Sequence, residues 1–282
     1  MRAALFAAPD PARGSVVVSP GRTEPIEKYF ETAADLNGRG WTVVAHDWRG
    51  QGLSARLLPD PTPGHAIGYR DFLTDYRALL DAFAARLPQP WIGLGHSMGG
   101  CLTLLALAEG ERRLAAAILS APMLGLSTGR VPLWAARIMA RGQRLAGRGA
   151  RLAAAAEAEP QSFAANILTH DAERFARNEA LLAAAPQLGL GAPTWGWVDF
   201  AFDAISRLQR GPAVRRIGVP VTFVLAGEEK LVDNGGARMV AARLPNARLV
   251  EIPGAYHELL QETDPVRAAF FAEFDRLAAG LA

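Results

Sequence analysis

One serine stands in a setting that suits nucleophilic chemistry. The pentapeptide Gly95-His96-Ser97-Met98-Gly99 fits the pattern G-x-S-x-G, directly follows the apolar run 91–94 and opens a helical pattern. A strand that turns at once into a helix holds the central residue in a strained conformation and exposes its side chain. We therefore interpret Ser97 as a nucleophile for an ester carbonyl. The backbone N–H of Met98, at the helix N-terminus, is then placed to donate to the oxyanion that forms.

A serine hydroxyl is a weak nucleophile at neutral pH and needs a base within hydrogen-bond reach. Five histidines are available. His257 follows the last predicted strand, in a loop expected over the same sheet edge as Ser97, and we interpret it as the base. The others are interpreted as packing or turn residues (His46, His96) and as solvated or substrate-lining residues (His65, His170).

The base in turn needs an acid that orients it. The segment after the preceding predicted strand carries three carboxylates, Glu228, Glu229 and Asp233. All three lie between Ser97 and His257 in the chain, so the order is nucleophile, acid, base. Position along the chain leaves the choice among the three open.

The elements that position these residues alternate between strand and helix. Short β-rich runs predict strands at 15–18, 41–45, 91–94, 115–119, 221–225 and 247–252. Helical spacing predicts helices at 29–36, 72–87, 101–108 and 265–281. This alternation predicts an α/β protein with a mostly parallel central sheet flanked by helices. Between residues 127 and 209 the chain shows long Ala/Arg/Leu helical stretches and no clear strand. We predict a core domain of residues 1–126 and 210–282 with an inserted helical cap at 127–209.

Several motifs together resemble the monoacylglycerol lipase and lysophospholipase branch of the α/β-hydrolases, and most closely its bacterial lysophospholipases. They lie at residues 19–24, 46–54, 95–100, 191–198 and 254–258. The resemblance implies an α/β-hydrolase fold and a serine hydrolase that cleaves a lysophospholipid or monoacylglycerol through an acyl-enzyme. The alternatives are a short-chain carboxylesterase, an aminopeptidase-like hydrolase with the same triad, and a catalytically silent scaffold that binds a lipid or other ligand.

The resemblance also assigns two residues. The acid of this family stands three positions before a small apolar residue, which here selects Glu229, three before Val232. Because Glu replaces the usual Asp and Ala226 replaces the leading glycine, Asp233 stays an alternative. The second oxyanion donor follows a His-Gly pair in the lipases. That pair reads Pro20-Gly21 here, so the backbone N–H of Arg22 takes the position. The motif from Asp47 to Ser54 is interpreted as a structural turn near the site.

The predicted cap carries two features that bear on the substrate. Arginines at spacings of four, three, four and three would form one basic stripe on a helix; they are Arg137, Arg141, Arg144, Arg148 and Arg151. The stripe fits either a solvated face or contact with an anionic membrane or phospholipid head group. An aromatic cluster follows, for which an acyl-chain site and cap core are equal alternatives; it comprises Trp195, Trp197, Phe200 and Phe202. We select Trp195 and Trp197 as substrate-binding candidates.

Composition sets the remaining limits. The chain has 282 residues, half of them apolar, and a net charge of only +2, which argues against a nucleic-acid partner. No apolar run approaches the roughly 18 residues of a membrane span, and the N-terminal stretch, halted by Pro9, does not resemble a signal peptide. The single cysteine, Cys101, is interpreted as a packing residue. We expect a cytoplasmic enzyme, with peripheral contact to the inner membrane as a variant, that uses neither a cofactor nor a metal.

Overall fold

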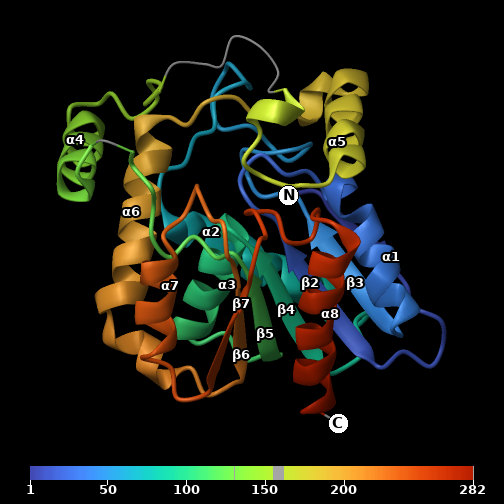
Figure 1. Cartoon of the computed structure of the whole chain (residues 1–282). Helices are drawn as coiled ribbons and strands as arrows, with labels where there is room; N and C mark the ends of the chain where they lie inside the picture. Colours follow the sequence, from blue (N-terminus) through green and yellow to red (C-terminus); the bar gives the residue numbers. More distant parts are fainter. Residues whose placement is uncertain (130, 155–161, 282) are drawn as a thin grey trace.

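The structure, a computed structural model, describes residues 1–129, 131–154 and 162–281. Within them the centre is a seven-stranded sheet in the order β1-β3-β2-β4-β5-β6-β7. The first strand is antiparallel to its neighbour and the others are parallel (Figure 1). The strands are β1 Ala3–Phe6, β2 Gly14–Ser19, β3 Trp41–His46, β4 Trp91–His96, β5 Leu114–Ser120, β6 Val221–Ala226 and β7 Ala247–Ile252.

Helices cover both faces of this sheet (Figure 1). On one face lie α1 (Phe30–Gly38) and α8 (Asp264–Ala279), and on the other α2 (Tyr69–Phe83), α3 (Met98–Ala108), α6 (Trp195–Arg210) and α7 (Asn234–Ala241). In β2, Val16 and Val18 pack with α1 and α8, whereas Val17 packs with the opposite cluster. Successive side chains of a strand point to opposite faces, so a strand buried on both sides must be apolar throughout.

The predicted α/β-hydrolase fold with a mostly parallel sheet is therefore confirmed. Each predicted strand and helix is present, with ends that differ by at most a few residues. The edge strand β1 was not predicted from the sequence. Its four residues are only partly buried and pair with β3 alone, so they carry neither a long apolar run nor a clean alternation.

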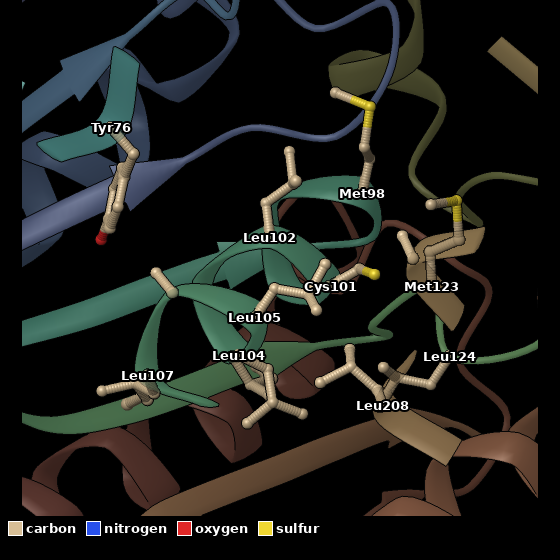
Figure 2. Packing of buried hydrophobic residues seen from close by; sticks show 14 of the residues in the cluster. Tyr76, Met98, Cys101, Leu102, Leu104, Leu105, Leu107, Met123, Leu124 and Leu208 are labelled. Carbon is tan, nitrogen blue, oxygen red and sulfur yellow. The ribbon is translucent and has the colours of Figure 1, made fainter. Parts of the chain in front are cut away.

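The helix that follows Ser97 is the most deeply buried of the core. Every residue of α3 from Met98 to Leu107 is buried. Figure 2 shows its leucines and Cys101 packed among Met123, Leu124 and Leu208. Cys101 is buried as the packing interpretation requires, and burial raises the pKa of its thiol. Close packing on all sides fixes the start of this helix, and with it the position of the preceding serine.

The segment predicted as a cap contains α4 (Leu133–Leu145), α5 (Ala172–Ala184), α6 and short 3₁₀ turns, with no strand among its described residues; residues 130 and 155–161 of this prediction lie outside the described part. The helix α6 packs on the core, where the Phe200 ring lies 4.8 Å from that of Phe72. In contrast, α4 lies on the outer side of α6 (Figure 1). Division into a core and a cap remains a prediction, and α6 connects the two.

Candidate active site

Ser97 lies at the sharp turn between β4 and α3. Its backbone has φ +50° and ψ −115°, outside the regions that a residue with a side chain ordinarily adopts. Backbone hydrogen bonds hold this conformation: the Ser97 N–H donates to the Ser120 carbonyl at 3.0 Å, and the Ser97 carbonyl accepts from Cys101 at 3.1 Å and Met123 at 2.9 Å. Strain of this kind persists only where the surroundings over-determine it. The turn places Ser97 directly after the carboxyl end of β4.

The glycines of the pentapeptide are required by close packing. A Cβ on Gly95 would lie 2.6 Å from the Cα of Gly100, and one on Gly99 would collide with the carbonyls of Ser19 and Pro20. The chain after β2 therefore passes directly over the first turn of α3. Because β2 and β4 are parallel neighbours, with Ser19 opposite Gly95, residues 20–22 leave the sheet beside the serine.

His257 and Glu229 meet above the neighbouring strands. The two loops are joined where the Glu228 N–H donates to the Ala255 carbonyl at 2.9 Å. His257 Nδ1 lies 2.7 Å from Glu229 Oε2, and both side chains are almost completely buried. With Nδ1–H donated to the carboxylate, Nε2 is the ring nitrogen that can accept a proton.

The carboxylate of Glu229 is held from its other side as well. Its Oε1 accepts backbone N–H groups from Lys230 at 2.9 Å, Leu231 at 2.8 Å and Val232 at 3.2 Å. Burial alone would raise the pKa of Glu229, but the hydrogen bond and charge of His257 together with these N–H groups bring the pKa below its usual value. The group is therefore a carboxylate at neutral pH.

The other two carboxylates of this segment lie elsewhere. Asp233 precedes α7 and caps it, accepting the Gly235 N–H at 2.8 Å. Glu228 is half exposed and lies 4.0 Å from His170. The structure thus brings His257 together with Glu229 and with neither alternative.

The remaining histidines have other surroundings. His46 is buried against Trp48, and burial lowers its pKa to about 3. His96 is buried beside His257, with ring centroids 4.8 Å apart. His65 Nδ1 is paired with Thr194 Oγ1 at 2.8 Å. His170 pairs with Glu262 and stacks on Tyr256.

The loop that carries Arg22 is held at several points. The Gly21 N–H donates to Glu24 Oε2 at 2.6 Å, and the side chains of Trp48 and Gln51 donate to the Pro20 and Gly21 carbonyls. The Arg22 side chain donates to the Gly191 carbonyl, and its guanidinium lies over the ring of Trp197 at 5.3 Å. The loop therefore contacts both the nucleophile turn and the start of α6.

Sequence reasoning gave no role to a buried ionic cluster beneath this loop. Lys28 Nζ lies 2.8 Å from Glu24 Oε1 and 2.5 Å from Glu258 Oε1, next to His257 in the chain, and Tyr29 donates to Glu24 at 2.5 Å. Burial opposes ionisation of Glu24, but Lys28 and His96 lower its pKa to about 2. Burial raises the pKa of Glu258. The i, i+4 spacing of Glu24 and Lys28 is the feature of the sequence that could have indicated this ion pair.

The aromatic cluster divides among three environments. Phe200 belongs to the core, whereas Phe202 and Trp195 pack with α4. Trp197, one of the two substrate-binding candidates, lies against the guanidinium of Arg22, the residue whose backbone N–H is the proposed oxyanion donor. Among the described residues, no group of three or more His, Cys, Asp or Glu side chains is arranged to hold a metal ion.

Comparisons with known proteins show the family and the fold. Residues 10–264 match the family described as serine aminopeptidase, S33. The chain is 35% identical to lysophospholipase L2 of Escherichia coli K12, over 90% of this chain and 76% of that protein. It is 28% identical to a monoacylglycerol lipase of Mycolicibacterium smegmatis, over 89% and 84%. A crystal structure of monoacylglycerol lipase from Paleococcus ferrophilus shares the fold with a TM-score of 0.76 at 19% identity, covering 99% and 98% of the two chains.

Proposed function

Because the chain belongs to the serine aminopeptidase S33 family and is a serine ester hydrolase of α/β-hydrolase fold, we propose that it cleaves lysophospholipids or monoacylglycerols through an acyl-enzyme on Ser97. The observation that carries the assignment is the buried Glu229–His257 pair at the sheet edge where Ser97 lies. The names of the relatives support the lipid substrate class.

The proposed reaction follows from the hydrogen bonds of the pair. His257 Nε2 takes the proton from Ser97 Oγ as the oxygen attacks the ester carbonyl, and Glu229 stabilises the imidazolium. The oxyanion accepts the N–H groups of Met98 and Arg22, each donor contributing about 10²–10³ in rate. As the intermediate collapses, His257 returns the proton to the leaving alcohol. In the second half-reaction His257 removes a proton from a water molecule, which attacks the acyl-enzyme. Collapse of this second intermediate releases the free carboxylic acid and restores Ser97.

Active-site labelling tests the nucleophile. A fluorophosphonate probe is expected to label the wild-type protein and not Ser97→Ala, and the substitution should lower kcat by about 10⁶-fold. Folded wild-type protein that takes no label would favour a silent ligand-binding scaffold.

A substrate panel tests the substrate class. We expect hydrolysis of lysophosphatidylcholine and of monoacylglycerol to exceed that of p-nitrophenyl butyrate and of an amino-acid p-nitroanilide in kcat/KM. Preference for p-nitrophenyl butyrate would indicate a short-chain carboxylesterase, and preference for the anilide would indicate an aminopeptidase-like enzyme.

We further propose that α4 contacts an anionic membrane surface. Among the described residues no helix is both long and apolar enough to span a bilayer. The α4 helix nevertheless exposes Trp134, Ile138 and Leu145 by 69%, 65% and 75%, spaced along one side. Such a face with adjacent arginines is typical of helices that lie in the interface plane.

The arginines divide into two groups. Three of them bond to α6: Arg137 donates to Ser206 Oγ at 3.4 Å, and Arg141 and Arg144 pair with Asp199 at 3.3 and 2.7 Å. Arg148 and Arg151 lie beyond the end of α4 and are exposed. The single helical stripe expected from the spacing therefore ends at Arg144, because the helix stops at Leu145 before Gly147, whose φ is +72°.

Vesicle binding tests this contact. Binding to phosphatidylglycerol-containing vesicles, measured by sedimentation, should weaken as salt is added. The binding constant should fall roughly thirtyfold when Arg148 and Arg151 are both replaced by alanine, because each arginine contributes about 1 kcal/mol of binding free energy. Trp134→Ser should also weaken binding, whereas Met239→Ser, at a half-exposed position of α7, should not. Equal binding by all variants would exclude α4 as the contact.

A further inference from the structure

The turn after β3 reaches across to the loop that carries the proposed oxyanion donor. Trp48 Nε1 donates to the Pro20 carbonyl at 2.9 Å, and Gln51 Nε2 donates to the Gly21 carbonyl at 3.0 Å. Trp48 is fully buried and Gln51 is 3% exposed. Two consecutive carbonyls of the loop are thus bound by side chains of the motif from Asp47 to Ser54, so this motif does more than form a structural turn.

The bond to Gly21 determines the direction of the Arg22 N–H. The Gly21 carbonyl and the Arg22 N–H belong to one planar trans peptide, in which the two bonds point in opposite directions. Whatever holds the carbonyl therefore aims the N–H. In this peptide the carbonyl is held by Gln51.

The preceding peptide is fixed separately. Its carbonyl, on Pro20, accepts from Trp48, and its N–H, on Gly21, donates to Glu24 Oε2 at 2.6 Å. A Cβ on Gly21 would lie 2.7 Å from that same oxygen and 3.0 Å from the ring of His96, so the loop packs directly beside the residue before Ser97.

The residue after Arg22 has a strained backbone, which these hydrogen bonds help to hold. Thr23 has φ +69°, which a β-branched residue adopts only under constraint. Relaxation of Thr23 would rotate the Arg22–Thr23 peptide and, through the Cα of Arg22, would pull on the Gly21–Arg22 peptide that carries the Arg22 N–H. External hydrogen bonds oppose that rotation.

The turn itself is rigid enough to act as a support. Asp47 accepts the Ile26 N–H and the Leu53 N–H, each at 2.9 Å, and the Gln51 N–H donates to the Trp48 carbonyl at 3.1 Å. A Cβ on Gly52 would collide with the Asp47 carboxylate, so the turn closes tightly around that group. These buried backbone contacts therefore fix the position of Gln51.

We propose that Gln51 is a positioning residue for ester hydrolysis, which holds the Gly21–Arg22 peptide so that the Arg22 N–H points at the forming oxyanion. The proposal rests on the proposed function, and specifically on the Arg22 N–H as a donor. Gln51 touches no reacting atom; it acts through the peptide whose carbonyl it binds.

The variant Gln51→Met tests this role, because methionine keeps the size of the side chain and removes the donor. We expect kcat for p-nitrophenyl butyrate to fall about 10- to 100-fold, part of the loss that follows removal of a whole donor, with KM within about twofold. A trifluoromethyl ketone, which forms an oxyanion on the serine, should bind more weakly by the same factor as kcat/KM falls. The midpoint of the pH profile of kcat/KM should stay unchanged, because the His257–Glu229 pair is untouched.

Gln209→Met is the matched control. Gln209 Nε2 donates to the Leu124 carbonyl at 2.7 Å, so this variant loses the same kind of bond away from the Arg22 loop. Each variant should lower Tm by about 2–4 °C, the effect of one hydrogen bond in a chain of this size, but only Gln51→Met should lower kcat. Should Gln51→Met not fold, Gln51→Leu, which is smaller and likewise has no donor, replaces it with the same expectation.

Three results would overturn the proposal: kcat within twofold of wild type, a loss confined to KM, or an equal loss in Gln209→Met. Failure of the proposed function gives a different result. In that case the wild-type protein itself would show no labelling or turnover that depends on Ser97.

Discussion

The contact between Glu229 and His257 makes Glu229→Gln the most informative substitution in the site. The glutamine has the shape of glutamate, so the three backbone N–H groups at Oε1 can still bind an oxygen there. Its NH2 group then stands 2.7 Å from His257 Nδ1 in place of a carboxylate oxygen. Two donors cannot face each other, so Nδ1 must lose its proton and Nε2 must carry it. An imidazole in that tautomer cannot accept the proton of Ser97.

The expected loss follows from this change of tautomer. The same replacement in the serine-protease triad lowers kcat by about 10⁴-fold with the geometry intact, which corresponds to about 5 kcal/mol of transition-state stabilisation. We expect a similar loss in kcat for p-nitrophenyl butyrate, with KM nearly unchanged. The assay is steady-state hydrolysis together with the rate of fluorophosphonate labelling, since both depend on activation of Ser97.

Asp233→Asn is the matched control for this prediction. Asparagine caps a helix about as well as aspartate, so the hydrogen bond to the Gly235 N–H and the start of α7 should survive. We expect activity within about threefold of wild type, because no contact joins Asp233 to His257 in the described structure. A large loss in Asp233→Asn with little in Glu229→Gln would refute the reasoning and reassign the acid.

Three further predictions concern stability. Burial lowers the pKa of His46 to about 3 and that of His96 to about 4; both are neutral when folded but gain protons in the unfolded chain below pH about 6.5. Stability present at pH 7 should therefore be lost as the pH falls below 6.5, by about 2 kcal/mol per histidine at pH 5, and equal urea unfolding free energies at the two pH values would contradict this. Gly99→Ala should destabilise the fold by about 3 kcal/mol and reduce kcat, because its Cβ would displace the Ser19 and Pro20 carbonyls. Gly142→Ala, in open space within α4, should instead stabilise by about 0.5–1 kcal/mol, and thermal unfolding distinguishes the two.

The sheet and its order of elements were predictable because strands buried on both faces must be apolar over their whole length. The run at 221–225 has this character and forms the buried strand β6. The run at 247–252 does not, because it contains Arg248 and Glu251 and forms the mostly exposed edge strand β7. Packing between distant segments was not predictable in the same way. The helical insertion predicted at 127–209 includes most of α6, but only the contact of Phe200 with Phe72 shows that this helix belongs partly to the core.

Polar partners were harder still, because a hydrogen bond between segments far apart in the chain leaves no periodic trace. Lys28 and Glu258 are separated by 230 positions. Gln51 gave no signal at all, since one amide side chain in a turn has many possible partners. Its role follows only from the crossing of the turn after β3 with the loop after β2.

The sequence motif alone does not identify the acid that pairs with His257. A loop after a strand restricts the carboxylate to a few positions, and Glu228, Glu229 and Asp233 all lie within six residues. What separates them is how the backbone turns. The N–H groups of the three residues after Glu229 converge on its Oε1, which leaves Oε2 for His257, whereas Asp233 uses its carboxylate to begin α7. The longer glutamate spans from its own turn to the imidazole, so the shape of the loop, and not the identity of the acid, selects the residue that contacts the base.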